Sequence, residues 1–188
     1  MLERLDREQP VAGADLIVLS EHVDYWNHLG WKDPYSSALY SERQRQYARL
    51  LKGEVYTPEM VLDGAEGLVG NDETEVARAI KAEAKLPRQT LHVAAVREGK
   101  QARVDVRADS AVEGPVYIAL AHDAMKSQVL KGENAGRGLS HVAVVYAIGP
   151  GAIGETKVNL SAGNEKTRIV VFAVRADGRV VAAGLARL

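Results

Sequence analysis

The 188-residue sequence contains no cysteine. A chain without thiols can form neither a disulfide framework nor a thiolate metal site from its own residues. Cysteine usage therefore gives no indication of the redox compartment in which the protein works. Redox or metal chemistry based on thiols would need groups that this chain does not supply.

Long apolar runs and basic clusters are also missing. No apolar run approaches the roughly 20 residues that a membrane-spanning helix needs. The formal net charge is -1, and the basic residues are not interleaved with aromatics as on a nucleic-acid surface, so we expect no nucleic-acid partner. The initial segment MLERLDREQP lacks the apolar core of a secretory signal. We therefore expect a cytoplasmic, processed or fragmentary chain, and its start in the middle of a helical pattern favours a fragment.

The residues that are present predict a globular protein with two lobes of opposite charge. Hydrophobic residues make up 46% of the chain, enough to fill a core. Residues 1–87 hold 10 Lys+Arg against 16 Asp+Glu, a net charge of -6, whereas residues 88–188 hold 14 against 9, a net charge of +5. This asymmetry favours two lobes that attract each other.

Local signals in residues 1–87 predict a mixed α/β lobe. The order is the end of an amphipathic helix at Met1–Glu8, a buried strand at Leu16–Leu19, and a helix that starts near Ser36–Ser37. A hairpin with an Asp63-Gly64 turn follows, and then a helix with Asp72 in the position of a capping residue. Residues 88–188 predict β structure instead, because short apolar runs alternate with Gly-containing turns as in an antiparallel sandwich or barrel. The predicted strands are 91–96, 102–106, 116–120, 142–148, 153–160, 169–174 and 180–185.

The stretch Glu21–Tyr35 concentrates two His, two Asp, both Trp and two Tyr residues in fifteen positions. In an extended strand His22 and Asp24 face the same way, so they could share a zinc, manganese or iron ion with His28 and Asp33. They could equally form half of a nucleophilic triad, although no GxSxG motif supplies a nucleophile. A structural role, in which an Asp orients a His at a strand end, is as consistent with the pattern.

A second polar cluster lies in the Gly-rich segment 132–141. It does not end in the GK[ST] of a phosphate-binding loop, so an ordered loop is the better interpretation. Its candidate residues are Glu133, Asn134, Arg137 and His141. Two other histidines, His92 and His122, stand singly in strand-like runs and suggest no site.

Taken together, several motifs resemble a known family. LSEHVDYWNHLGWKDPYSS, VYTPEMVLDG, GENAGRGLSHVAVV and RIVVFAVRADGRVVAAG are similar to the bacterial family DUF1223, a thioredoxin-like family of unknown function. The resemblance spans essentially the whole chain. It implies a thioredoxin-like lobe at 1–87 followed by an antiparallel β-sandwich or barrel-like lobe at 88–188.

The resemblance also implies a pocket. Thr57-Pro58 would take the place of the cis-proline loop, which in such folds faces a redox dithiol and pairs with an extended, thiol-bearing substrate. Members of the family usually carry a strand and a CxxC segment before the first helix, and commonly a secretion signal. Here the dithiol is absent, so we expect this chain to be inactive in disulfide exchange. The implied pocket residues are His22, Asp24, Tyr25, Trp26, Trp31, Tyr56, Thr57 and Pro58.

Three functional hypotheses follow. The first is a thioredoxin-like protein related to thiol-disulfide exchange that lacks its own redox cysteines. The second is a non-enzymatic module that binds a peptide or small ligand in an aromatic cleft between the lobes. The third is a metal-binding protein that uses His22 and Asp24. We expect no cofactor, and an exposed sheet edge beside Leu16–Leu19 would favour self-association.

Overall fold

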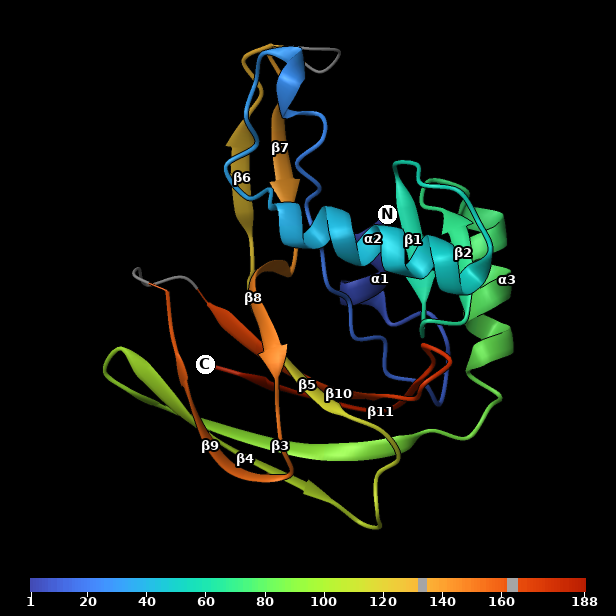
Figure 1. The fold of residues 1–188 in the computed structure, drawn as a ribbon, viewed down its shortest axis with the longest axis vertical. Coiled ribbons are helices and arrows are strands. Elements are labelled where there is room, and N and C mark those ends of the chain that lie inside the picture. The colour runs from blue at the N-terminus through green and yellow to red at the C-terminus, as the bar shows by residue number, and fades with distance from the viewer. Residues whose placement is uncertain (132–134, 162–165) are drawn as a thin grey trace.

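The computed structural model describes residues 1–131, 135–161 and 166–188. Within them, three helices and a small hairpin occupy residues 1–87, and a curled seven-stranded sheet is formed by residues that follow (Figure 1). The helices are α1 (Leu2–Glu8), α2 (Ala38–Leu51) and α3 (Glu73–Glu83), with a short 3-10 turn η1 (Asn27–Leu29). The overall class is therefore mixed α/β, as the sequence predicts.

Side-chain caps fix the helix starts. The Ser37 hydroxyl accepts a hydrogen bond from the Leu39 N–H at the start of α2. The Asp72 carboxylate accepts one from the Glu75 N–H at the start of α3. Each cap satisfies one of the backbone donors that the first turn of a helix leaves without a partner. Both starts therefore follow from short-range sequence signals.

The predicted hairpin is present and is formed by β1 (Glu59–Leu62) and β2 (Glu66–Val69). Its turn contains Asp63 and Gly64, both at positive φ, which is the conformation that such residues tolerate in tight turns. The peptide bond between Thr57 and Pro58, directly before β1, is cis.

The large sheet has the strand order β8-β5-β10-β11-β3-β4-β9. Neighbouring strands are antiparallel except β11 and β3, which are parallel. A separate hairpin, β6-β7, rises from one end of the sheet beside the loop that precedes α2 (Figure 1). The strands are β3 (Gln89–Glu98), β4 (Gln101–Ala108), β5 (Val116–His122), β6 (Met125–Gln128), β7 (Gly138–His141), β8 (Val144–Pro150), β9 (Gly154–Asn159), β10 (Thr167–Val174) and β11 (Val180–Arg187).

The sheet curls so that its two halves share one core. Val104 on β4 and Leu120 on β5 belong to the same buried cluster, although three strands separate them in the sheet. The opposite face of β10 is covered too, because Val170 and Phe172 pack with Tyr40 of α2 and Val18. This double coverage explains why seven of the eight residues of β10 are buried.

Two sequence predictions need correction at this point. The run Leu16–Leu19 does not form a strand. Its neighbour Ser20 makes a single bridge to Val144, and in the described part of the chain no strand pairs with Leu16–Leu19. The second half was predicted to be an antiparallel sandwich or barrel, but its seven long strands form one continuous curled sheet. The β6-β7 hairpin was not predicted.

Ion pairs join the helices to the sheet. The buried Arg168 guanidinium of β10 donates two hydrogen bonds, 2.8 and 2.9 Å long, to Asp6 of α1 and pairs with Asp123 at 2.6 Å. The Glu83 carboxylate of α3 pairs with Arg88 and, at 2.8 Å, with Arg179. The opposite net charges of the two halves are thus partly neutralised across their contact.

Candidate binding site between the helices and the sheet

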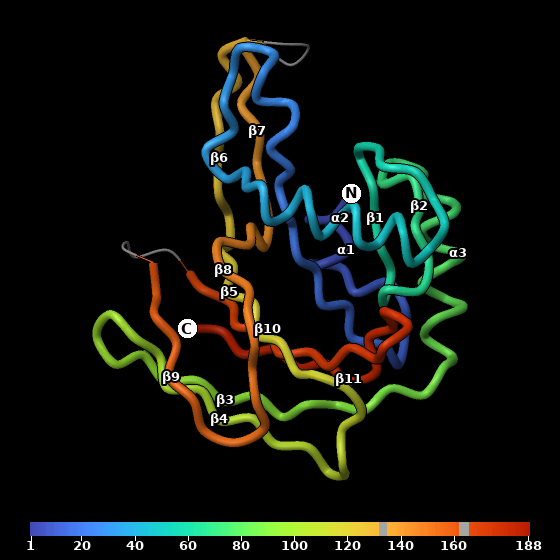
Figure 2. Tube along the Cα trace, in the orientation of Figure 1, coloured from blue at the N-terminus to red at the C-terminus, as the bar shows by residue number. Residues whose placement is uncertain are grey.

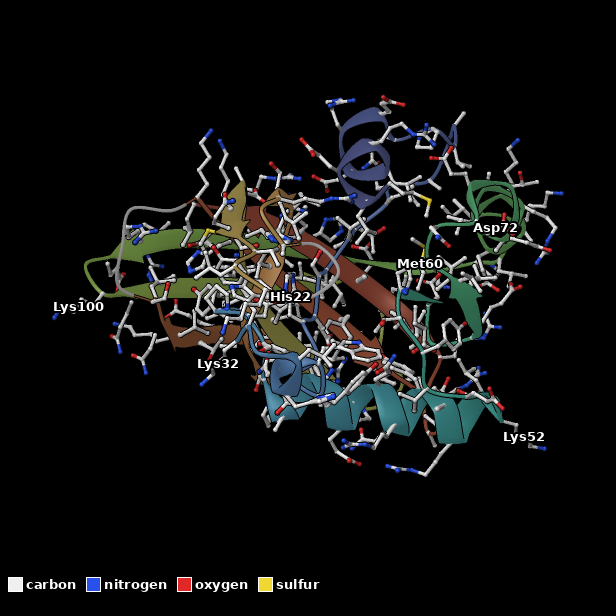
Figure 3. The ribbon with its side chains drawn as sticks, turned by 90° about the horizontal axis from the view of Figure 1, so that it is seen from above. His22, Lys32, Lys52, Met60, Asp72 and Lys100 are labelled. Atoms are coloured by element: carbon white, nitrogen blue, oxygen red, sulfur yellow. The ribbon has the colours of Figure 1, made fainter. Side chains whose placement is uncertain are left out.

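A large cavity lies between the helices and the sheet. Its volume is about 1580 Å³, and one side is lined by the segment 16–19 and the other by β1. Segment 16–19 and β1 run in opposite directions (Figure 2), and residues of both line the cavity. Segment 16–19 and β1 form a layer between the helices. Seen from above, α2 covers one face of this layer, and α1 and α3 cover the other, with Met60 and His22 labelled between them (Figure 3). The cavity is therefore enclosed by secondary structure on several sides.

One wall of the cavity is an open strand edge. β1 pairs only with β2 among the described strands. Because the Gly70 N–H bonds to the Pro58 carbonyl at 2.7 Å, the alternation of an antiparallel ladder directs the backbone groups of Met60 and Leu62 toward β2. The N–H and C=O groups of Glu59 and Val61 consequently point away from β2, on the cavity side of the strand.

The opposite wall is extended but not part of a sheet. The Leu16 backbone is held by the side chain of Gln9, whose amide accepts from the Leu16 N–H at 2.6 Å and donates to its carbonyl at 3.0 Å. Ser20 bonds on both sides to the chain around β8, at Ala143 and Val145. Between these two attachments, the described residues supply no strand partner for Ile17–Leu19. Two extended segments therefore face a common cavity.

The two faces of the cavity differ in polarity. Met60 and Leu62 belong to the apolar cluster that contains Leu5 of α1 and Ile80 of α3. On the other face α2 presents Arg43, which donates a 2.8 Å hydrogen bond to the Glu21 carboxylate.

The α2 face also carries tyrosines. Burial raises the pKa of the Tyr40 hydroxyl to about 12, and this hydroxyl donates to the Val145 carbonyl at 2.9 Å. Burial likewise raises the pKa of Tyr47, which accepts a hydrogen bond from Arg43. An extended chain in the cavity would meet aliphatic side chains on one face and polar ones on the other.

A polar cluster surrounds Gln44 at the Pro58 end of β1. The Gln44 amide donates to the Tyr56 carbonyl at 2.6 Å and to the Glu59 carboxylate at 2.7 Å, and it accepts from the Tyr25 hydroxyl at 2.9 Å. Beside this cluster the Trp26 indole N–H donates to the Thr57 hydroxyl at 3.0 Å. Gln44 thereby links α2, the start of β1 and the aromatic stretch.

A second cluster joins two histidines that also line the cavity. His22 Nδ1 donates to the Asp33 carboxylate at 2.7 Å, and its ring centroid lies 4.8 Å from that of His141 on β7. His141 Nε2 lies 2.8 Å from the hydroxyl of the buried Ser127. Tyr35 packs edge-on against both imidazoles. This cluster fastens the β6-β7 hairpin to the loop that precedes α2.

The charges of this histidine cluster are coupled. Burial, and then the neighbouring His22, lower the pKa of His141, while Asp33 opposes the shift. Burial would raise the pKa of Asp33, but the hydrogen bonds from His22 and the Tyr35 N–H outweigh it and lower the value. The arrangement thus favours an ionised Asp33 and a neutral His141.

Comparison with known families identifies the chain. Residues 1–175 match the family described as "Protein of unknown function (DUF1223)". The chain belongs to the DUF1223 family. No curated protein matches it, and the described residues contain no helix long and apolar enough to cross a membrane.

A solved structure has a similar fold. This is the crystal structure of a protein from Agrobacterium tumefaciens, determined as a structural-genomics target. It is similar with a TM-score of 0.65 and 25% sequence identity, and the alignment covers 100% of the present chain and 84% of the other. Neither the family description nor this structure names an activity.

The structure separates the predicted DUF1223 pocket residues into groups. His22, Thr57 and Pro58 line the cavity, whereas Asp24 and Trp31 are not among its lining residues. His22 and Asp24, which the sequence allowed to form a pair, have different partners in the structure. Asp24 instead accepts a 2.6 Å hydrogen bond from Ser41, and His22 bonds to Asp33. In the part of the chain that the structure describes, no group of three or more His, Cys, Asp or Glu residues could hold a metal ion.

The second predicted cluster divides in a similar way. Glu133 and Asn134 lie outside the described residues. Arg137 is exposed and its carbonyl accepts from the Val129 N–H at 2.9 Å. The fold places the His141 ring next to the His22 ring. This contact was not predicted from the sequence. No spacing rule connects two histidines 119 positions apart, so only the tertiary structure could show it.

Proposed function

We propose that this protein binds an extended polypeptide segment without covalent chemistry, in the cavity between segment 16–19 and β1. The observation that carries the proposal is the cavity-side edge of β1, where the backbone groups of Glu59 and Val61 have no strand partner among the described residues. A strand edge of this kind binds peptides by main-chain hydrogen bonds and uses flanking pockets for alternate side chains.

The surroundings of the edge support an extended ligand over a compact one. Helices cover both faces of the layer that contains β1, so a ligand has to fit between α1 and α2 (Figure 3). The second extended segment, Ile17–Leu19, offers further backbone groups across the cavity. A single strand satisfies both edges at once, whereas a rounded ligand would leave backbone donors and acceptors without partners.

A thioredoxin-like arrangement of residues 1–87 is part of the same proposal. The order of an extended segment, α2, the β1-β2 hairpin and α3 supports it, with residues 88–188 forming a β-rich second domain. A relation to thiol-disulfide exchange would then concern substrate binding only. With no cysteine, the chain cannot itself form a mixed disulfide with a substrate.

The test is a pair of proline substitutions in the hairpin. Val61→Pro removes a backbone N–H on the cavity side of β1, and Val69→Pro removes the equivalent outward N–H on the far edge of β2. Proline is tolerated where an edge-strand N–H makes no ladder bond, so we expect both variants to fold. The probe is a five-residue peptide of alternating Val and Thr with blocked ends, and its affinity is measured by calorimetry.

We expect Val61→Pro to weaken peptide binding about tenfold, because it loses a backbone hydrogen bond of about 0.5–1.5 kcal/mol and adds a ring at the edge. Val69→Pro should bind as the unmodified protein does. Thermal unfolding of both variants controls for folding. Equal affinities in Val61→Pro and the unmodified protein, or no binding of the probe to the unmodified protein, would show that the β1 edge is not a peptide site.

A further inference from the structure

Two loops meet at one end of the long axis of the molecule. One is η1 with the residues after it, and the other is formed by the ends of β6 and β7 that lie farthest from the large sheet (Figure 1). The loops are in contact, because a Cβ built on Gly30 would lie 3.3 Å from the Lys131 Cδ. The Tyr35 hydroxyl also donates a 2.6 Å hydrogen bond to the Lys126 carbonyl of the hairpin. We refer to the described residues of 27–33 and 126–138 as the tip.

Two leucines of the tip face the solvent. Leu130 on one loop is 71% exposed, and Leu29 on the other is 51% exposed. They directly precede Lys131 and Gly30, the residues at which the loops touch. Single exposed leucines are common, but apolar side chains gathered at one projecting point are typical of a surface that contacts a protein or a membrane.

Hydrogen bonds hold both loops in place. The Asn27 side chain accepts from the Asp33 N–H at 3.1 Å, which closes the loop around η1. In the hairpin, the Val129 N–H donates to the Arg137 carbonyl at 2.9 Å, and the Val129 side chain is buried. Neither leucine belongs to one of the buried apolar clusters formed by the described residues. The tip therefore presents both leucines to the outside from a hydrogen-bonded backbone.

The charge of the tip is opposite in sign to that of the whole chain. Residues 27–33 and 126–138 contain four Lys or Arg and two Asp or Glu, a net charge of +2, whereas the chain has a net charge of -1. The Asp33 carboxylate is engaged by His22 at 2.7 Å. Three exposed lysines of the tip take part in none of the ion pairs formed among residues 1–131, 135–161 and 166–188, and they are Lys32, Lys126 and Lys131. Such a surface is complementary to an anionic partner.

An anionic lipid surface suits this tip better than a folded protein does. A stable protein interface buries about 800 Å² on each partner and uses about 20–30 residues a side, more than a convex end formed by two short loops offers. Leucines beside lysines are instead typical of segments that bury apolar side chains in the headgroup region while basic residues attract anionic lipids. Because the tip lies at one end of the long axis, it can reach a flat surface before the rest of the molecule does (Figure 1).

We infer that the tip binds the surface of a membrane that contains anionic lipids. Leu29 and Leu130 insert among the headgroups, and Lys32 and Lys131 lie beside the lipid phosphates. The contact is peripheral, so it needs no membrane-spanning segment, and it uses neither β1 nor the cavity. In the bound state the long axis of the molecule stands along the membrane normal.

The experiment measures co-sedimentation with vesicles of phosphatidylcholine alone and with vesicles of equal parts of phosphatidylcholine and phosphatidylserine. The test variants are the double change Leu29→Ser with Leu130→Ser, and the single change Lys131→Gln. The controls are Val96→Ser and Lys100→Gln, because Val96 of β3 is 54% exposed and Lys100 is exposed in the turn between β3 and β4, away from the tip (Figure 1). All of these side chains are exposed, so the variants should fold, and thermal unfolding checks this.

We expect the unmodified protein to sediment with the phosphatidylserine vesicles far more than with phosphatidylcholine alone. The double leucine variant should bind these vesicles at least about tenfold more weakly, because it loses the burial of two apolar side chains. Lys131→Gln should bind about fivefold more weakly, which is the contribution of one basic residue near an anionic membrane. Both controls should bind as the unmodified protein does, and added salt should weaken binding in every case.

Equal sedimentation with the two kinds of vesicle, or unchanged binding by the double leucine variant, would overturn the inference. Failure of the unmodified protein to bind either vesicle would reject it too. Sedimentation velocity without vesicles tests the alternative occupant, a second copy of the chain: self-association that disappears in the double leucine variant would assign the tip to a protein contact instead. These results do not depend on peptide binding, so the membrane contact and the proposed function can fail separately.

Discussion

Replacing Asp6 by Ala should remove the main polar attachment of α1 to the sheet. The Arg168 side chain is only 2% exposed; it donates two hydrogen bonds to Asp6 and forms an ion pair with Asp123. A hydrogen bond to a charged group contributes about 1.5–3 kcal/mol, and losing one partner of a buried ion pair costs about 3–5 kcal/mol. Because Asp123 still compensates the guanidinium in the variant, we expect the free energy of unfolding to fall by about 3 kcal/mol.

A matched control is an exposed ion pair that joins the same helix, α1, to α3. Arg4 of α1 pairs with Glu73 of α3 at 2.7 Å, but these side chains are 49% and 57% exposed. Exposed ion pairs contribute about 0–1 kcal/mol, so Glu73→Ala should change stability by less than 1 kcal/mol. Urea unfolding followed by far-UV circular dichroism measures both variants. Similar midpoints for Asp6→Ala and Glu73→Ala would refute the claim that burial makes the Arg168 pair strong.

The same pair predicts a pH dependence. The hydrogen bonds from Arg168 lower the pKa of Asp6, although burial opposes them. A carboxyl group whose pKa is lower in the folded state contributes stability above its unfolded pKa, near 4, and loses it as the pH falls through the folded value. The stability difference between the unmodified protein and Asp6→Ala should therefore be constant near neutral pH and decrease below about pH 4.

Two further predictions concern the hairpin turn and the histidine cluster. Gly64→Ala should destabilise the fold by more than ~2 kcal/mol, since the new Cβ would lie 1.9 Å from the Gly178 carbonyl oxygen. The control is Gly99→Ala, which has nearly the same φ but open space around it and should cost only about 1 kcal/mol. Equal unfolding midpoints for the two variants would contradict the steric argument. Because the pKa of His141 is lowered in the folded state, the unfolded chain binds a proton more readily and stability should fall below about pH 6.5. His141→Gln should weaken this dependence in urea unfolding at pH 5 to 8, and an unchanged pH profile would show that His141 does not cause it.

Short-range signals predicted the local elements well. Ser37 and Asp72 cap α2 and α3, and Asp63-Gly64 forms the turn of the β1-β2 hairpin, because each of these features depends on a few neighbouring residues. The seven strands of the large sheet follow the predicted apolar runs for the same reason. What these signals cannot provide is the pairing between strands distant in sequence, such as the parallel contact of β11 with β3.

The candidate site was predicted only in part. Thr57, Pro58 and His22 were expected at a pocket, and they line the cavity. The apolar run Leu16–Leu19 was expected to be a strand because aliphatic continuity is typical of buried strands, but a strand also needs a partner with a free edge.

The position of β1 between α1 and α2 restricts which molecules can reach its open edge. Exposed strand edges normally risk pairing with the edges of other folded sheets, which leads to aggregation. An edge that lies below the level of flanking helices cannot meet the edge of another sheet, since the helices collide first. For the proposed peptide site, this means that a segment without structure of its own, such as a chain terminus, a long loop or a polypeptide that has not yet folded, would fit between the helices where a folded sheet would not.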